Sequence, residues 1–238
     1  MEKGSESPSL SREKRDRKPI RRGRRIILAS GSPRRRAILR MLGIEHEIGA
    51  VDVDETALPG EAPEVTARRV AEMKARAALV GCQGVAIGAD TIVVVDGQGL
   101  GKPVDADEAR SMLERLRGRS HEVVTGVAVV DSETGSSCVS SVTTAVWMRD
   151  YGDDEMAAYV AQGEPFDKAG AYAIQSESFH PVARIEGCYL NVVGLPACEL
   201  IQRLHLIAPW VKWTWSTELE EVCRRCSVSP IAGPSLKA

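Results

Sequence analysis

The side chains best suited to bind an anion lie in one short segment, Ser30-Gly31-Ser32-Pro33-Arg34-Arg35-Arg36. Ser32 is suited to cap a helix and Pro33 to begin it, because proline has no N–H to leave unbonded. The free backbone N–H groups and the dipole at a helix N-terminus attract anions, whereas arginines in the first turn contradict the usual preference for acids there. The segment predicts a site for a multiply charged anion, such as a nucleoside triphosphate. A solvated basic helix face is the alternative.

Two acidic positions could supply the chemistry beside that anion. Asp90 follows the apolar run Val85–Ala89, and a carboxylate at a strand end suits metal binding or general-base work. A capping or turn aspartate is the alternative. Glu55, next to Asp54 in an acidic turn, offers oxygens of the kind that hard divalent cations prefer.

Two further segments carry polar residues suited to contact a nucleotide. Lys102 lies in a loop shaped by glycine and proline, where a phosphate contact or simple exposure is possible. Residues 167–175 place Lys168 before a run of small residues and Gln175 at its end. Glutamine has both a donor and an acceptor, so it can read a base edge. A structural ion pair is the alternative for Asp167 and Lys168.

The elements that must position these residues alternate between strand and helix signals. Strands are predicted at Arg25–Leu28, 45–50, Val85–Ile87, Ile92–Val95, Val123–Val130, Cys138–Trp147, Tyr172–Ile174 and Val182–Ile185. Helices are predicted at Arg34–Leu42, Glu64–Val80, Asp105–Leu116, Tyr151–Ala161 and Leu195–Leu206, and Asp96-Gly97 predicts a hairpin. Ser32 and Asp105 are the predicted N-caps. The order favours an α/β domain with a mixed, partly antiparallel sheet flanked by helices.

Composition bounds the class of protein. The 238 residues are 43% hydrophobic, which is enough for a full core, and no run resembles a membrane span or a signal peptide. Six cysteines without a disulfide framework suit a reducing compartment. We therefore expect a cytoplasmic protein, or a nuclear one if the basic leader directs import.

The two ends differ from the body. Residues 1–25 contain ten Lys and Arg against four Asp and Glu, which gives them a net charge of +6. Because the whole chain has a net charge of −2, residues 26–238, the body of the chain, carry −8. We expect a disordered basic leader over residues 1–24, a domain over 25–207 and a tail of different composition over 208–238, which packs back on the domain or stays disordered. The tail holds three tryptophans and the pair Cys223 and Cys226, which is half a zinc site at most. The acidic body argues against nucleic-acid binding.

Taken in order, these segments resemble the Maf family. Three further blocks carry the same resemblance: Gly88-Ala89-Asp90-Thr91, His121 through Thr125-Gly126-Val127 and Asn191-Val192-Val193-Gly194-Leu195-Pro196. The resemblance spans about residues 25–206. It implies a fold similar to that of inosine triphosphate pyrophosphatases and hydrolysis of a nucleoside triphosphate to the monophosphate and pyrophosphate with a divalent cation, Mg²⁺ or Mn²⁺. Residues 176–178 depart from the family, which usually has a glycine-containing turn there.

The resemblance also implies roles for individual residues. Asp90 matches the general base, and the base-selecting positions correspond to Arg34, Thr91 and Gln175. The triphosphate or metal contacts correspond to Ser30, Arg35, Glu55, Lys102 and Lys168, with Glu55 and Asp90 as metal ligands. The block ending in Gln175 looks like the branch that acts on dTTP and UTP. A homodimer is plausible for this family, and no membrane partner is expected.

Two alternatives stay open at this point. The same chemistry could act on 7-methyl-GTP or another modified nucleotide. The chain could also be a non-catalytic nucleotide-binding regulator, whose leader and tail engage a partner.

Overall fold

A computed structural model describes residues 24–224. The predictions for the leader and for Cys226 lie outside these residues. The elements follow the order β1 (Ile26–Leu28), α1 (Pro33–Met41), β2 (Glu47–Ile48), α2 (Pro63–Ala77), β3 (Val85–Val95), β4 (Gln98–Leu100), α3 (Ala106–Leu116), β5 (Ser120–Asp131), β6 (Ser137–Met148), α4 (Asp153–Ala161), the 3₁₀ turns η1 (Glu164–Asp167) and η2 (Ala169–Ala171), β7 (Val182–Glu186), α5 (Tyr189–Val193), α6 (Ala197–Ile207) and α7 (Thr217–Arg224).

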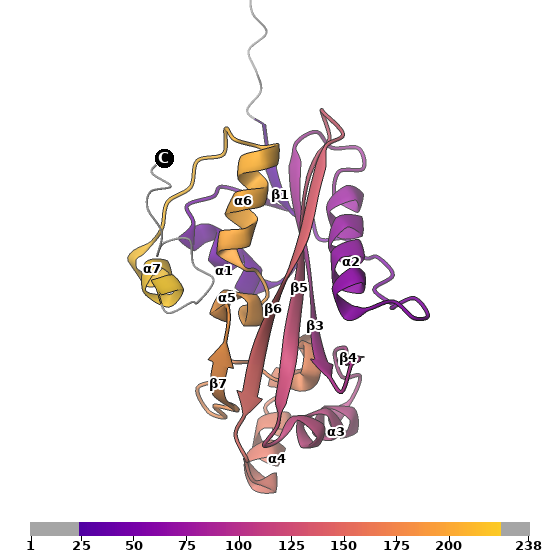
Figure 1. Cartoon of the computed structure of the whole chain (residues 1–238), viewed down its shortest axis with the longest axis vertical. Helices are drawn as coiled ribbons and strands as arrows, with labels where there is room; N and C mark the ends of the chain where they lie inside the picture. Colours follow the sequence, from indigo (N-terminus) through magenta and orange to yellow (C-terminus); the bar gives the residue numbers. More distant parts are fainter. Residues whose placement is uncertain (1–23, 225–238) are drawn as a thin grey trace, which may run out of the picture.

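One mixed sheet organises the described part of the chain. Its strand order is β2-β1-β3-β5-β6-β7, with β4 paired to β3. β1 runs parallel to both of its neighbours, and the other pairs are antiparallel. In Figure 1, α2 covers one face of the sheet, α1, α5 and α6 lie on the other, and α3 and α4 close its lower end. The predicted fold class, a mixed sheet flanked by helices, is confirmed.

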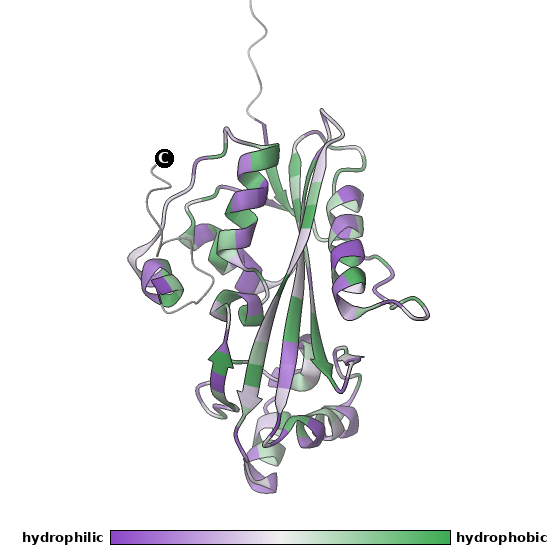
Figure 2. Cartoon of the chain, in the orientation of Figure 1, coloured by the Kyte–Doolittle hydropathy of each residue, from purple (hydrophilic) through white to green (hydrophobic). Residues whose placement is uncertain are grey.

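Apolar side chains concentrate between these layers. Hydrophobic colouring follows the strands and the helix faces turned toward them (Figure 2). The largest cluster packs α1, α6 and α7 against the sheet around Leu28, Ile38 and Leu200. A second cluster joins α3 and α4 to the lower ends of the long strands around Leu113, Tyr159 and Phe179. The sheet is therefore buried on both faces, which keeps the strands that position the site rigid.

The helix caps and the hairpin turn form at the residues where the sequence predicts them. Ser32 accepts a hydrogen bond from the N–H of Arg35 at 3.4 Å, and Asp105 accepts one from Glu108 at 2.8 Å. Asp96 and Gly97 both adopt positive φ angles in the β3–β4 turn, as a tight hairpin requires. These predictions are confirmed, because caps and turns depend on neighbours in sequence.

Two strand predictions are wrong. Residues 85–87 and 92–95 are one continuous strand, so Asp90 lies inside β3 and pairs with Gly126 rather than ending a strand. Residues 172–174 form no strand. The N–H of Ala173 donates to the Tyr159 phenol at 3.1 Å, in a segment entered through the left-handed residues Gly170 and Ala171.

The spacing of Val65, Val70, Met73, Ala77 and Val80 predicts one apolar stripe on the helix over residues 64–80, and the structure buries a different face. Val65 and Val80 are exposed, by 43% and 81%. The buried face instead holds small residues and one charge: Thr66, Ala67, Val70, Ala71, Lys74 and Ala75. Small side chains let this helix lie close against the sheet.

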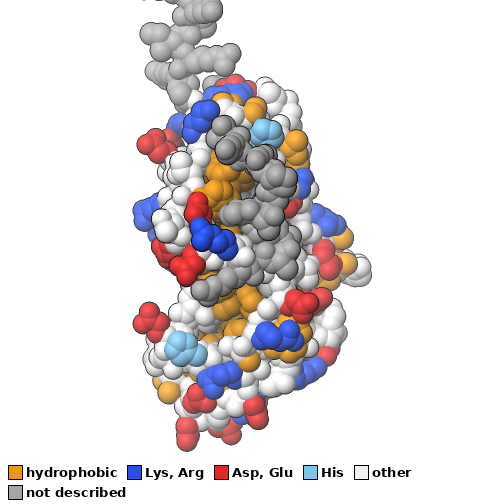
Figure 3. All heavy atoms as spheres, turned by 60° about the vertical axis from the view of Figure 1, so that its left-hand side comes forward, with side chains coloured by type: hydrophobic (Ala, Val, Ile, Leu, Met, Phe, Trp, Pro, Cys, Tyr) orange, Lys and Arg blue, Asp and Glu red, His pale blue; other side chains and the backbone are white. Residues whose placement is uncertain are grey.

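The described part of the tail packs onto the body. Leu219 and Cys223 of α7 are buried in the largest cluster, and Trp213 and Trp215 pack against its edge. The face that carries α7 exposes hydrophobic side chains along its middle, with charged ones around them (Figure 3). None of the described helices combines the length and apolar content needed to cross a bilayer.

Candidate active site

A cavity of about 830 Å³ opens where the N-terminus of α1, the loop before α2, β3 and the η1–η2 segment meet. All nine predicted site residues line it: Ser30, Arg34, Arg35, Glu55, Asp90, Thr91, Lys102, Lys168 and Gln175. They come from segments up to 145 positions apart in the sequence, and the fold brings them together. The volume suits a small-molecule ligand.

Two carboxylates in this cavity converge on one buried ammonium group. Nζ of Lys74 lies 2.7 Å from Oε1 of Glu55 and 2.8 Å from Oδ1 of Asp90. The side chains of Lys74 and Asp90 are each 9% exposed, whereas that of Glu55 is 46% exposed. Burial opposes the charge of Glu55, yet the hydrogen bond and charge of Lys74 hold the pKa of its carboxyl below the ordinary value. Lys74 therefore favours the ionised form of Glu55 and holds the two carboxylates close together.

Sequence reasoning missed Lys74. The signal was available, because Lys74 follows Val70 by one helical turn and so falls on the apolar side of the predicted helix. A lysine on a buried helix face needs a partner, and Asp90 is that partner. Asp54 was considered with Glu55, but its carboxylate instead accepts a hydrogen bond from the N–H of Thr56 at 2.9 Å.

A network of hydrogen bonds fixes the guanidinium of Arg35. Its Nε donates to the carbonyl of Gly194 at 2.8 Å, Nη1 to Oγ of Ser30 at 3.2 Å, and Nη2 to Oγ1 of Thr91 at 3.1 Å. Oγ1 of Thr91 lies 3.0 Å from Oγ1 of Thr125 on β5. Burial lowers the pKa of Arg35, and the charge of Asp90 offsets part of that effect. The result is a fixed cation beside the capped N-terminus of α1.

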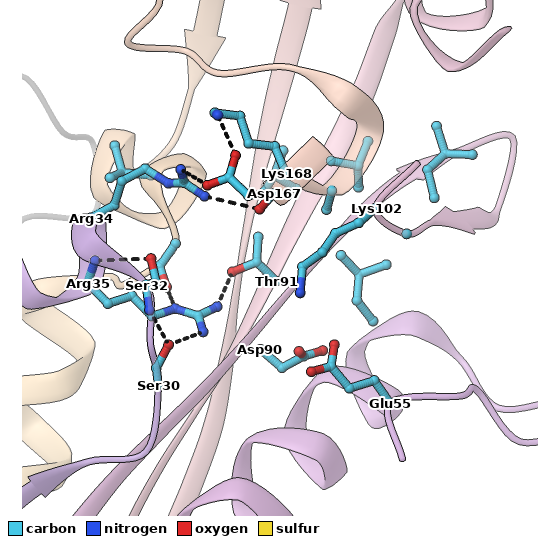
Figure 4. Close-up of a pocket in the computed structure, with 18 of the residues that line it drawn as sticks. Ser30, Ser32, Arg34, Arg35, Glu55, Asp90, Thr91, Lys102, Asp167 and Lys168 are labelled. Atoms are coloured by element: carbon cyan, nitrogen blue, oxygen red, sulfur yellow. Dashed lines mark hydrogen bonds and ion pairs between the residues drawn. The ribbon is translucent and has the colours of Figure 1, made fainter. Parts of the chain in front are cut away.

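The acidic and basic groups are spread across the cavity (Figure 4). Glu55 and Asp90 face each other at one end, and Lys102 extends from the loop after β4 toward them. Arg35 and Thr91 lie between that end and the opposite one, where Arg34, Asp167 and Lys168 gather. Lys102 is exposed and adds positive potential at Glu55. The arrangement suits a ligand that is strongly anionic along one part of its length.

An ion-pair cluster closes the end opposite the two acids. Nη1 of Arg34 lies 3.0 Å from Oδ2 of Asp167, and Lys168 donates to Oδ1 of the same carboxylate and to the carbonyl of Glu164. Burial opposes the charge of Asp167, but the hydrogen bonds from Lys168 and Arg34 keep the pKa of its carboxyl below the ordinary value. The structure thus places the ammonium of Lys168 on Asp167.

Gln175 and its neighbours line the wall near α5. Gln175 is exposed, and burial raises the pKa of the Tyr189 phenol while a hydrogen bond with Gln175 partly offsets that effect. Behind the same wall, Nε2 of His121 lies 2.7 Å from the phenol oxygen of Tyr172. Burial lowers the pKa of His121 to about 4, so this histidine stays neutral. It braces the wall and does not face the ligand as an acid.

The oxygen set at Glu55 and Asp90 fits a hard divalent cation that arrives with phosphate. Mg²⁺ is often held by one or two carboxylates plus substrate phosphate oxygens, with water completing the shell. Residues 24–224 contain no group of three or more His, Cys, Asp or Glu side chains placed to hold a metal. The positive charge of Lys74 further reduces the attraction of the bare pair. Phosphate ligands would therefore be needed to complete such a site.

Known proteins resemble this chain over most of its length. The family described as Maf-like protein matches residues 25–207. A dTTP/UTP pyrophosphatase of Geobacter sp. (strain M21) is 50% identical over 183 residues, covering 76% of this chain and 95% of the relative. One of Geotalea uraniireducens (strain Rf4) is 51% identical over 180 residues, covering 75% and 93%.

Among solved structures, the Ham1 protein of Staphylococcus aureus matches with a TM-score of 0.42 and 17% identity, covering 66% of this chain and 88% of that one. A HAM1 protein from Coxiella burnetii matches with a TM-score of 0.41 and 18% identity, covering 65% and 89%.

Proposed function

This chain belongs to the family of Maf-like proteins, and we propose that it is a nucleoside triphosphate pyrophosphatase that hydrolyses dTTP and UTP to the monophosphate and pyrophosphate. The observation that supports this most is the cavity itself. It holds a close carboxylate pair at one end and a fixed arginine with a capped helix N-terminus beside it. The relatives that cover most of the chain are named for this reaction.

We infer that Glu55 and Asp90 hold a divalent cation together with the phosphate oxygens of the substrate. When bound, the cation would neutralise phosphate charge and strengthen the electrophilic character of the phosphorus. Mg²⁺ and Mn²⁺ are the cations expected from the oxygen ligands.

Different residues of the chain would then activate the water and hold the leaving pyrophosphate. Lys74 holds Oδ1 of Asp90, so the other carboxylate oxygen would accept the proton of the attacking water. Water would form the new bond to the α-phosphorus, and the bond to the pyrophosphate oxygen would break. Arg35, Lys102 and the N–H groups at the start of α1 would hold the departing pyrophosphate. Arg34, Thr91 and Gln175 remain the predicted base-selecting residues.

The test is pyrophosphate release by the purified protein with Mg²⁺ or Mn²⁺. The panel contains dTTP, UTP, CTP, 7-methyl-GTP and the standard purine triphosphates. We expect turnover of dTTP and UTP, and we expect Asp90→Asn to lower kcat by about 10²–10³ while the protein stays folded. Near-normal turnover by the folded variant would contradict the role of Asp90.

The panel also separates the alternatives. Turnover of 7-methyl-GTP alone would keep the chemistry and replace the substrate. Binding of dTTP without pyrophosphate release would instead favour a regulatory protein. We propose that the enzyme acts on free nucleotides in the cytoplasm; the homodimer stays a prediction.

A further inference from the structure

The two ends of the cavity differ in charge balance. Lys102 lies near the end at Asp90, and Arg35 lies between the two ends, so both cations are placed to meet a phosphate chain that starts at Asp90 (Figure 4). At the opposite end, Asp167 bonds to both Arg34 and Lys168. A phosphate placed there would meet a carboxylate held ionised, and it would have to compete with that carboxylate for both cations. The Asp167 end is therefore poorly suited to the triphosphate, and the base is the part of a nucleotide left to occupy it.

An unusual aromatic side chain lies at this same end. Phe166 is 39% exposed and lines the cavity. Of the large apolar side chains exposed in residues 24–224, it is the aromatic one, and it takes part in none of the four apolar clusters described there. The other phenylalanine of the chain, Phe179, stacks by contrast on Tyr159 with ring centroids 4.4 Å apart. The Phe166 ring thus retains a free apolar surface at the cavity wall.

The backbone holds Phe166 close to the ion-pair cluster. It precedes Asp167 in η1, a turn anchored by buried Pro165 and by the bond from Lys168 to the Glu164 carbonyl. Consecutive Cα atoms lie about 3.8 Å apart, so the ring starts from the same wall as the Asp167–Arg34 bridge. This bridge also ties the turn to α1. The ring is therefore held on a fixed turn.

We propose that Phe166 is the stacking platform for the nucleobase of the substrate. The inference rests on the proposed nucleotide substrate and adds the residue that binds the face of its base. Stacking on an aromatic ring tolerates any base, because every base presents a π-face. Phe166 would thus supply affinity for the base, and polar groups on the same wall would supply the choice among bases.

The experiment measures the binding of two ligands of which only one carries a base. UMP contains the base, and inorganic pyrophosphate contains only the phosphate chain. Equilibrium dialysis with each ligand compares the wild type with Phe166→Ala, Phe166→Leu and Phe166→Trp. Val104→Ala, an exposed apolar residue (85%) outside the cavity lining, is the matched control.

We expect Phe166→Ala to raise the Kd of UMP about 5- to 100-fold and to leave the Kd of pyrophosphate within about twofold. Phe166→Leu should weaken UMP binding similarly, because it keeps apolar bulk without a ring face, and Phe166→Trp should preserve it. An unchanged Kd for UMP in Phe166→Ala would overturn the proposal. An equal loss for both ligands would also overturn it, because it would indicate a general distortion of the cavity.

Pyrophosphate release by the wild type tests the proposed function separately from the role of Phe166. Ring-dependent UMP binding without release from any nucleotide would leave the stacking platform standing and reject the pyrophosphatase. Release from UTP with ring-independent UMP binding would do the reverse.

Discussion

At the scale of single residues, the site depends on a buried charge that sequence motifs did not reveal. Lys74 joins Glu55 and Asp90 across a cavity wall in which the ammonium and Asp90 are almost fully buried. Removing one partner of such a pair leaves an uncompensated charge in a poorly hydrated place, which costs more than the pair itself contributes. The ammonium also sets how near the two carboxylates can approach each other, so it links stability to the geometry of catalysis.

This leads to a prediction for Lys74→Met. We expect the free energy of unfolding to fall by about 3 kcal/mol near neutral pH. The deficit should shrink as the pH falls through the ordinary glutamate pKa of 4.5, because the wild type then loses the stabilisation that Lys74 gives to the charge of Glu55. Urea unfolding at several pH values measures both effects.

The matched control lies on the same helix. Arg76→Gln removes the exposed ion pair with Glu72, whose side chains are 51% and 32% exposed, and we expect a loss below about 1 kcal/mol. A deficit in Lys74→Met that does not vary with pH would contradict the unpaired-charge explanation.

At the scale of elements, two glycines allow α2 to present Lys74 to β3. A Cβ on Gly88 would lie 2.0 Å from the carbonyl oxygen of Ala71, and one on Gly126 would lie 2.1 Å from that of Ala67. The two positions lie on the neighbouring strands β3 and β5, where Gly126 is the register partner of Asp90. The helix backbone therefore rests directly on the sheet, and this close approach brings Lys74 within bonding distance of Asp90.

We accordingly predict that Gly126→Ala destabilises the protein by about 2–3 kcal/mol, because α2 must move away from the sheet. The same movement should lower kcat by separating Lys74 from Asp90. Thermal unfolding and pyrophosphate release measure the two effects.

Gly101→Ala serves as the stability control, since a Cβ there meets nothing within 4 Å. It should change the free energy of unfolding by less than about 0.5 kcal/mol. Wild-type stability in Gly126→Ala would show that the helix and sheet can separate without cost.

At the scale of the whole molecule, the family-matched body and the segment after residue 207 form one core. Leu219 is 1% exposed and packs in the cluster that also holds Leu39 and Leu204. The N–H groups of Thr214 and Ser216 donate to the carbonyls of Leu42 and Met41, at 2.9 and 3.2 Å. These bonds satisfy acceptors at the end of α1 that the helix itself leaves unbonded. The tail thus supports the helix whose other end lines the active site.

The whole-molecule prediction concerns Leu219→Ala. We expect a loss of about 2–4 kcal/mol in the free energy of unfolding, as for a leucine truncated in a well-packed core. KM for UTP should stay close to wild type, because the substitution is remote from the cavity. Denaturant unfolding and steady-state kinetics provide the two measurements.

Leu206→Ala, at a position 63% exposed, should change stability by less than about 0.5 kcal/mol. Equal effects of the two substitutions would mean that α7 contributes no more to the core than an exposed side chain does.

The sequence by itself determined the features that depend on near neighbours. Ser32 and Asp105 cap their helices, Asp96-Gly97 turns the hairpin, and the alternating strand and helix signals predict the mixed sheet. The resemblance to the Maf family, carried by the order of the motifs, implied the nine site residues that line one cavity. Such signals act over a few residues, so they can be read before the chain is folded.

Only the tertiary structure decided the partners of those residues. Periodicity could not show that Lys74 meets Asp90, that Asp167 holds both Arg34 and Lys168, or that Thr91 bonds to Arg35. Periodicity also predicted two separate strands, whereas the structure has the single strand β3, whose pairing with β5 continues through Asp90 and Gly126. Each of these outcomes depends on contacts between distant segments, and their geometry exists only after the sheet has assembled and α2 and η1 have packed beside it.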